Sequence, residues 1–477
     1  MAKPEVEIAD IGRLARRLVT RAVETARAED RPLRRVLLEH LGPSAAALPT
    51  VSATWPTWDH VNVQVGLDAW LAASPGRRHE VVGISGAGMA RHMDVTISDF
   101  LQSGPLSSAG ATGAITEAVA CGPGGQTRAC VINGIYLVSQ GDDRLAVMVL
   151  PVSRGPRSEI VVQVAGLSPG PAEAALAAIR ELALAGSVFR GQVLSFGPEL
   201  LGPGWGSAPL NFLERPAVDR TQVILPPGLL TEIERQVLGI RRHSGRLLAS
   251  GQHLRRGVLL HGAPGTGKTH TVSYLLSQLP GVTAVVISGR ALGAIVQACS
   301  LARSLQPSVV VIEDVDLIAE ERAARPGQQP LLFQLMNEME GLNSADDVTF
   351  LLTTNRADLL EPALAARPGR VDLAADLPLP DADARRALIR LYQGRLVLDT
   401  SPAGLDDVIA RTEGVTAPFL KELLRRAALL SAESDPDPAA DQPIRVADEH
   451  LAGALNQLLD ERGPLTRALL GGGRQSG

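Results

Sequence analysis

The chain has 477 residues, of which 45% are hydrophobic and 20% charged, and this length allows about two to four domains that each bury a core. Its 46 basic and 51 acidic residues leave a formal net charge of −5. The overall charge therefore gives no indication of nucleic-acid or anionic-membrane binding. Only three of the basic residues are lysines, which makes the position of each lysine informative.

The sequence carries no indication of secretion or membrane insertion. Met1–Arg17 alternates charged and apolar residues and does not have the pattern of a signal peptide. No stretch approaches the roughly 20 consecutive apolar residues that span a bilayer. The widely spaced Cys121, Cys130 and Cys299 fit neither a disulfide framework nor a zinc site. We therefore expect a cytoplasmic protein without a membrane partner, whose cysteines are reduced.

Residues 1–215 predict an N-terminal α+β domain. Met1–Val51 has apolar and arginine residues at helical spacing and predicts a helical start. Further along, the patterns predict three strands, a helix and a last strand: Gly134–Gln140, Arg144–Val152, Glu159–Gly166, Pro171–Ala185 and Val188–Phe196. The Gly- and Pro-rich run Phe196–Pro216 carries turn signals and marks the domain boundary.

Residues 216–376 predict an α/β domain with a parallel sheet and helices on both faces. Short apolar strands separated by amphipathic helices are typical of such a sheet. The predicted strands are Arg256–His261, Val282–Ser288, Ser308–Ile312, Val348–Asn355 and Val371–Leu377, with helices at Thr269–Leu279 and Leu331–Leu342. Residues 377–463 predict a small helical lid from the patterns Ala382–Leu391, Ala417–Ser431 and Val446–Leu459. The Gly-rich end, residues 464–477, is expected to be a disordered tail.

The strongest functional pattern is the glycine-rich segment Gly262–Thr269 (GAPGTGKT). It follows an apolar strand and opens a helix, which is the context of a phosphate-binding loop. Its glycines allow backbone N–H groups to point at a polyphosphate, and the helix N-terminus adds positive potential. Lys268 would reach the β- and γ-phosphates, and the Thr269 hydroxyl would ligate Mg²⁺. The predicted nucleotide-binding residues are Gly262, Ala263, Pro264, Gly265, Thr266, Gly267, Lys268, Thr269 and His270.

Three further motifs follow in a fixed order. The strand Ser308–Ile312 ends in Glu313-Asp314, the next strand ends in Thr353–Arg356 (TTNR), and Ala366–Arg370 (ARPGR) lies beyond. Together with the phosphate-binding loop, these motifs resemble the classical AAA ATPase family over roughly Gln222–Leu430. The family usually places Asp before Glu at the strand end. The inverted order here resembles that of the mitochondrial respiratory-chain assembly ATPases.

The resemblance implies an ATP hydrolase that uses ATP and Mg²⁺. In that family pattern, Thr269 and Glu313 would organise Mg²⁺, and Asp314 would polarise the attacking water. Asn355 would orient this water against the γ-phosphate, and Lys268 would hold the phosphates.

The resemblance also implies arginine fingers. Arg367 and Arg370 would reach the ATP site of a neighbouring subunit, and an extra alanine before them leaves open which of the two is the finger. A finger that acts in trans implies a homo-oligomer, typically a hexameric ring with heterologous interfaces.

The leading hypothesis is an oligomeric ATPase that remodels a protein client. Gly289–Pro307 contains no aromatic residue, so an aromatic pore loop that threads polypeptide is not expected. No His-Glu-x-x-His motif occurs, so no zinc peptidase is expected either. The inverted acids leave open a nucleotide-dependent scaffold with weak or no hydrolysis. The basic stretch Arg241–Arg256 leaves open a nucleic-acid-associated ATPase, although no nucleic-acid-binding module is evident.

Overall fold

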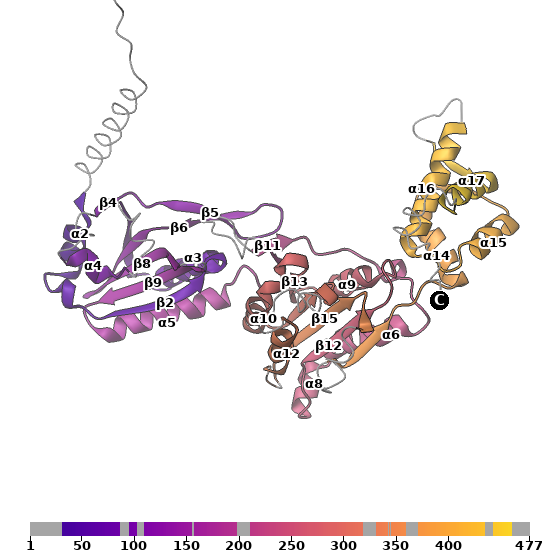
Figure 1. The fold of residues 1–477 in the computed structure, drawn as a ribbon. Coiled ribbons are helices and arrows are strands. Elements are labelled where there is room, and N and C mark those ends of the chain that lie inside the picture. The colour runs from indigo at the N-terminus through magenta and orange to yellow at the C-terminus, as the bar shows by residue number, and fades with distance from the viewer. Residues whose placement is uncertain are drawn as a thin grey trace, which may run out of the picture. The chain divides into compact units, whose positions relative to one another are not determined.

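The computed structural model describes residues 31–85, 95–102, 109–154, 157–197, 210–317, 331–341, 343, 345–358, 371–434 and 442–459. Contacts divide the chain into two units, each treated separately below. The N-terminal unit comprises Met1–Phe189 and Gly197–Phe212, and the C-terminal unit comprises Arg190–Phe196 and Leu213–Gly477. Figure 1 labels many of the elements of both units.

The N-terminal unit is built on an antiparallel sheet with the strand order β1-β4-β3-β7-β8-β9-β2. Its strands are β1 (Arg31–Pro32), β2 (Thr50–Pro56), β3 (Arg78–Ile84), β4 (Gly110–Thr112), β7 (Gly134–Gln140), β8 (Asp143–Arg154) and β9 (Arg157–Gly166). A separate hairpin is formed by β5 (Thr116–Ala120) and β6 (Thr127–Val131). The three strands predicted between residues 134 and 166 are thereby confirmed.

Helices bury both faces of this sheet (Figure 1). On β7, Ile135 and Leu137 pack with helices α2 (Leu33–Leu41) and α4 (Ile97–Leu101). The alternate residues Tyr136 and Val138 pack on the other face with α3 (His60–Ala72) and α5 (Pro169–Ala185), because successive strand residues point to opposite faces. The predicted helix Pro171–Ala185 is confirmed as α5.

The predicted helical start is wrong in its last part. Helix α2 ends at Leu41, a short 3₁₀ turn follows at Ala45–Ala47, and β2 begins at Thr50. Gly42 ends the helix with a positive φ of 88°, and the following proline lacks the amide hydrogen that would continue it. Residues 1–30 of the predicted helical start lie outside the described residues.

The C-terminal unit contains a parallel sheet with the order β10-β13-β14-β15-β12-β16. The strands are β10 (Val193–Phe196), β12 (Arg256–His261), β13 (Thr283–Ile287), β14 (Ser308–Ile312), β15 (Val348–Thr354) and β16 (Leu373–Asp376), and β11 (Leu210–Leu213) lies at the division between the units. The five strands predicted after residue 250 are confirmed. Strand β10 was expected in the N-terminal domain, but it pairs in parallel with β13.

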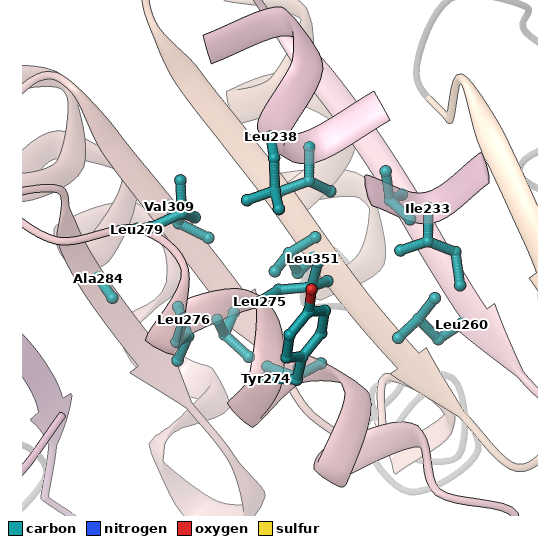
Figure 2. Close-up of a cluster of buried hydrophobic side chains, with 14 of the residues drawn as sticks. Ile233, Leu238, Leu260, Tyr274, Leu275, Leu276, Leu279, Ala284, Val309 and Leu351 are labelled. Atoms are coloured by element: carbon teal, nitrogen blue, oxygen red, sulfur yellow. The ribbon is translucent and has the colours of Figure 1, made fainter. Parts of the chain in front are cut away.

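Both faces of the parallel sheet are buried. Helix α9 (Lys268–Ser277), helix α6 (Leu229–Glu234) and the π-helical turn Arg235–Gly239 pack against one face, around Val309 and Val311. Figure 2 shows this cluster, in which side chains of α9 meet those of the strands. The alternate strand residues Val310 and Ile312 are also fully buried, and the contacts of β14 on that side include α10 (Ile295–Ser304), which packs with α12 (Leu331–Glu340). The predicted helices at 269–279 and 331–342 are confirmed within a few residues.

In its described residues, the lid comprises four helices and a small parallel sheet. The helices are α14 (Ala382–Gln393), α15 (Pro402–Arg411), α16 (Ala417–Ser434) and α17 (Asp448–Leu459), and the paired strands are β17 (Val397–Asp399) and β18 (Arg445–Ala447). Phe419, Leu420 and Leu423 of α16 lie at the centre of its core. The predictions of α14, α16 and α17 are confirmed, while α15 and both strands were not predicted. The predicted tail, residues 464–477, lies outside the described residues.

A substitution at Leu275 tests how much the packing of α9 on the sheet contributes to the free energy of unfolding. Its side chain is fully buried between α9 and the strands (Figure 2). The change Leu275→Ala leaves a cavity and should lower the free energy of unfolding by about 2–5 kcal/mol. Urea unfolding followed by circular dichroism measures this loss. The matched change Leu248→Ala in α8 (Ser244–Ala249), where the leucine is 40% exposed, should cost less than about 1 kcal/mol, and equal losses would contradict the expectation.

Candidate nucleotide-binding site

The phosphate-binding loop connects β12 to α9 through glycines in unusual backbone conformations. Gly262, Gly265 and Gly267 have φ angles of 144°, 81° and 99°, which side chains of L-residues rarely adopt. A Cβ atom on Gly262 would lie 2.3 Å from the carbonyl oxygen of Leu377, which immediately follows β16. The loop is therefore curled, and the residue that follows β16 packs directly against it.

Lys268, the first residue of α9, hydrogen-bonds through its side chain to the backbone of the loop. Its Nζ atom donates hydrogen bonds to the carbonyl oxygens of Gly262 and Ala263 at 2.7 and 2.9 Å. The side chain is buried, and this burial lowers its pKa, while the charges of Asp314 and Asp316 act in the opposite direction. The ammonium group is thus positioned where the curled loop would receive a polyphosphate.

The two acids after β14 have different partners. Glu313 accepts a hydrogen bond from the Thr269 side chain, and its burial raises its pKa above the usual range of a glutamate, with the neighbouring Asp314 charge adding to this effect. Asp314 instead accepts a hydrogen bond at 3.1 Å from Nδ2 of Asn355. The four residues that the sequence grouped for Mg²⁺ binding and for water activation are therefore brought together in two pairs.

Asp314 has a positive φ of 50°, which is uncommon outside glycine but tolerated by aspartate and asparagine. Its backbone N–H donates to Oγ1 of Thr353 at 3.1 Å, and Val315 N–H donates to the Thr353 carbonyl oxygen at 2.9 Å. The end of β15 therefore fixes the turn that carries the second acid. Because the carboxylate and Asn355 lie on adjacent strand ends, small movements of either strand would change their geometry.

Asp316 is a structural residue of this site that the sequence reasoning did not single out. Its Oδ1 atom accepts hydrogen bonds from the Thr354 hydroxyl at 2.8 Å and from the Asn355 backbone N–H at 3.3 Å. The residue is buried, so these bonds satisfy a carboxylate that would otherwise be costly to desolvate. Its place two residues after the acid pair in the sequence was the only available signal.

A cavity of about 730 Å³ adjoins the phosphate-binding loop, Asp314 and Asn355. Its size is within the range of small-molecule sites. It is lined by the loop, by Asp314 and Asn355, and by lid residues; the lining residues are Gln222, Pro264, Gly265, Gly267, Lys268, Thr269, His270, Asp314, Asn355, Leu391, Tyr392, Ala417, Pro418 and Lys421. A neighbouring cavity of about 540 Å³ adds Thr266 and the mainly apolar segments Gln222–Pro227 and Pro378–Pro380. The lining by Tyr392 and Lys421 was not predicted.

Three residues that the sequence predicted for this site have not yet been located: His270, Arg367 and Arg370. His270 lines the 730 Å³ cavity, and its Nε2 atom lies 3.0 Å from the Gln222 carbonyl oxygen. Arg367 and Arg370 lie outside the described residues.

Glu313 and Thr269 offer a carboxylate oxygen and a hydroxyl oxygen close to each other. Mg²⁺ prefers such oxygen ligands together with the phosphates of a substrate, so these two residues fit a magnesium site.

A curled glycine loop between a parallel strand and a helix, facing acids at the end of another strand, defines a P-loop nucleotide-binding domain. The family model "ATPase family associated with various cellular activities (AAA)" matches residues 258–379. Residues 258–379 therefore match an AAA domain.

Several known proteins are similar to part of this chain. The chain is 32% identical over 217 residues to the "ATPase family gene 2 protein homolog A" of Homo sapiens, covering 43% of this chain and 24% of that protein. It is 32% identical over 193 residues to the "26S proteasome regulatory subunit 6B homolog" of Encephalitozoon cuniculi, covering 38% and 49%. It is 30% identical over 328 residues to the "ATP-dependent zinc metalloprotease FtsH" of Acidothermus cellulolyticus, covering 61% and 46%.

The chain thus spans about half or less of the length of these relatives. Within the described ranges, the helices are too short or too polar to cross a bilayer.

The backbone at Asp314 can be tested by substitution. Asparagine tolerates the positive φ, so Asp314→Asn should unfold near the wild-type temperature. Asp314→Val places a β-branched residue in this conformation and should lose about 1–3 kcal/mol of stability. Thermal unfolding measures both variants. Asp314→Ala, which also lacks the carboxylate, is the control, and equal stability of the Val and Ala variants would contradict a conformational constraint.

Proposed function

We propose that this protein binds ATP with Mg²⁺, hydrolyses it in a homo-oligomeric ring, and uses the energy to remodel a protein client. The observation that carries the proposal is the presence of two hydrogen-bonded pairs beside one cavity, which Thr269, Asp314 and Asn355 line. Thr269 hydrogen-bonds to Glu313, and Asn355 hydrogen-bonds to Asp314, next to the loop that holds Lys268. A catalytic site for phosphoryl transfer needs phosphate binding, metal binding and water orientation in such proximity.

Each residue of the site has a distinct task in this proposal. Lys268 exchanges its two carbonyl partners for the phosphate oxygens when the nucleotide binds. Asp314 orients a water molecule and accepts its proton, and Asn355 keeps the carboxylate and the water aligned. Mg²⁺, bound by Glu313 and Thr269, would neutralise charge on the phosphates.

The changes Lys268→Ala and Asp314→Asn distinguish an enzyme from a scaffold. Lys268→Ala should weaken ATP binding about 100-fold or more and abolish hydrolysis, because the loop loses its cation. Asp314→Asn should retain ATP binding and lower steady-state hydrolysis about 100-fold or more, because the carboxylate that accepts the proton is gone. Equilibrium titration and phosphate release measure the two properties.

A control for these variants is Arg241→Ala, because Arg241 pairs with Asp347 at 2.7 Å and does not line the cavity. It should keep the wild-type rate. If wild-type and Asp314→Asn proteins hydrolyse ATP at equal rates, the nucleotide-dependent scaffold is the better description.

We further propose that the ring is a hexamer in which Arg367 or Arg370 completes the neighbouring subunit's site. An arginine in trans stabilises the charge of the transition state and is worth about 10³–10⁵ in rate. A head-to-tail interface that closes into a ring supplies one such arginine to every site. A single subunit would therefore be a poor catalyst.

Mixing two inactive variants tests this arrangement. Asp314→Asn lacks the acid but keeps the arginine, and Arg367→Ala or Arg370→Ala lacks one arginine but keeps the acid. If the arginine acts in trans, mixing Asp314→Asn with the variant of the true finger should restore part of the ATPase activity. Phosphate release from mixed and unmixed samples measures this. Absence of recovery in both mixtures would contradict a finger in trans.

The choice of a protein client is supported by the relatives. Two of them are named as a proteasome regulatory subunit and as an ATP-dependent metalloprotease. This sequence lacks a His-Glu-x-x-His motif, so we propose remodelling without proteolysis and without an aromatic pore loop. The N-terminal unit is the proposed client-binding part, and the proposed location is the cytoplasm. Capturing proteins on ATP-loaded Asp314→Asn would identify the client, and loss of capture without ATP would support its coupling to the nucleotide.

The alternative of a nucleic-acid-associated ATPase has less support. In the basic stretch, Arg241 is paired with Asp347, and the Arg256 guanidinium group contacts His253 and the Arg255 carbonyl oxygen. These arginines serve contacts within the protein, which favours the protein-directed function.

A further inference from the structure

The N-terminal unit contains a cavity of about 410 Å³, a size within the range of small-molecule sites. It is lined by residues of α3 and the segment after it, of α5, and of the paired strands β7 and β8. The lining includes the buried side chains of Trp70, Val138 and Leu145. An apolar group that enters the cavity therefore leaves water for an apolar surface.

The cavity has room because small side chains stand where larger ones would fill it. Helix α5 contributes Ala174, Ala175 and Ala178 to the lining. These alanines share one face of the helix, since residues three and four positions apart are neighbours on its surface. Ala73, which follows the end of α3, adds a fourth methyl group. The space in front of Trp70 is therefore free for the side chain of a ligand.

Arg77 places a fixed cation at this cavity. Its guanidinium carbon lies 4.2 Å from the centre of the Trp70 ring, and Nη1 donates to the Trp70 carbonyl oxygen. Nε and Nη2 both donate to Oε1 of Gln140, at 3.0 and 2.8 Å. Three of the five N–H groups are thereby used, and one remains on each terminal nitrogen. Burial lowers the pKa of Arg77, and among the described residues no carboxylate pairs with it, so two donors are left for an anion.

Asp143 supplies the opposite charge. In the pairing of β7 with β8, Gln140 lies opposite Asp143 and Val138 lies opposite Leu145, and all four residues line the cavity. The Asp143 side chain is exposed, and within the described ranges of the chain it makes neither a hydrogen bond nor an ion pair. The cavity thus carries a cation and a carboxylate, each next to Gln140, that do not neutralise each other.

We propose that this cavity binds a free α-amino acid with an apolar side chain. The α-carboxylate accepts the two remaining N–H groups of Arg77, the α-ammonium group pairs with Asp143, and the side chain lies against Trp70. Two donors on one guanidinium suit the two oxygens of a carboxylate better than the single carbonyl oxygen of a peptide. The site lies within the N-terminal unit, so the inference does not depend on the proposed ATPase function.

The two charged contacts are tested on the ligand, because Arg77 also holds Trp70 and Gln140 and its replacement would disturb the fold. Isothermal titration calorimetry of the full chain should detect L-leucine or L-phenylalanine at millimolar concentrations. The amide of the same amino acid, which lacks the carboxylate, should bind about 10-fold or more weakly. The matching acid without the amino group should bind about 3-fold or more weakly, because the Asp143 contact is exposed.

Three outcomes of this titration overturn the inference. The first is that neither amino acid binds. The second is equal binding of the amide, which would indicate the amino terminus of a polypeptide as the ligand. The third is equal binding of the acid without the amino group, which would leave Asp143 without a role.

Two pairs of variants test the position of the site. Asp143→Asn should weaken binding about 3-fold or more, whereas Asp142→Asn, next to it but outside the lining, should bind as the wild type does. Ala174→Leu fills the cavity and should weaken binding about 10-fold or more. Ala177→Leu, at an exposed position of the same helix outside the lining, should not. Thermal unfolding shows that each variant is folded, and equal affinities within either pair overturn the inference.

Discussion

The site depends on one constraint, that the carboxyl ends of the parallel strands meet at one edge of the sheet. In this order β15 lies between β14 and β12, so the acids of one neighbour and the loop of the other flank Asn355. The hydroxyls of Thr353 and Thr354 then bind the Asp314 backbone and the Asp316 side chain, respectively. Because these hydrogen bonds cross from one strand end to the next, the acid turn has a fixed position relative to the loop.

The phosphate-binding loop is shaped by protein neighbours on several sides. The Leu377 carbonyl lies against Gly262, residues of α16 lie against Gly265, and His270 contacts the Gln222 carbonyl. At the far end of α9, the Arg215 guanidinium donates to the carbonyl oxygens of Leu276, Val282 and Gly191 at 2.7–3.0 Å. A loop ordered in advance loses little conformational freedom when it binds a ligand, so more of the binding energy is retained.

The sequence predicted the parts of the molecule in which local pattern and tertiary structure agree. The apolar run Ser308–Ile312 and the loop Gly262–Thr269 carry their structural context in adjacent residues, so both were found with correct neighbours. Pairing between distant residues was not predictable in the same way. Strand β10 has a plain apolar pattern that does not indicate β13 as its partner, and β17 and β18 are three-residue strands that form only because the lid brings them together. The role of Asp316 depends on hydrogen bonds to another strand, which no local pattern reveals.

The inverted order of the acids has a physical explanation in this geometry. Glu313, the longer side chain, reaches the Thr269 hydroxyl at the start of α9, and burial raises the pKa of its carboxyl group. Asp314, the shorter side chain, is aimed by a positive φ and by the end of β15, and meets Asn355. The two acids therefore differ in side-chain length and in the partner that each one meets. In the proposed function, this pairing fits metal binding by Glu313 with Thr269 and water activation by Asp314 with Asn355.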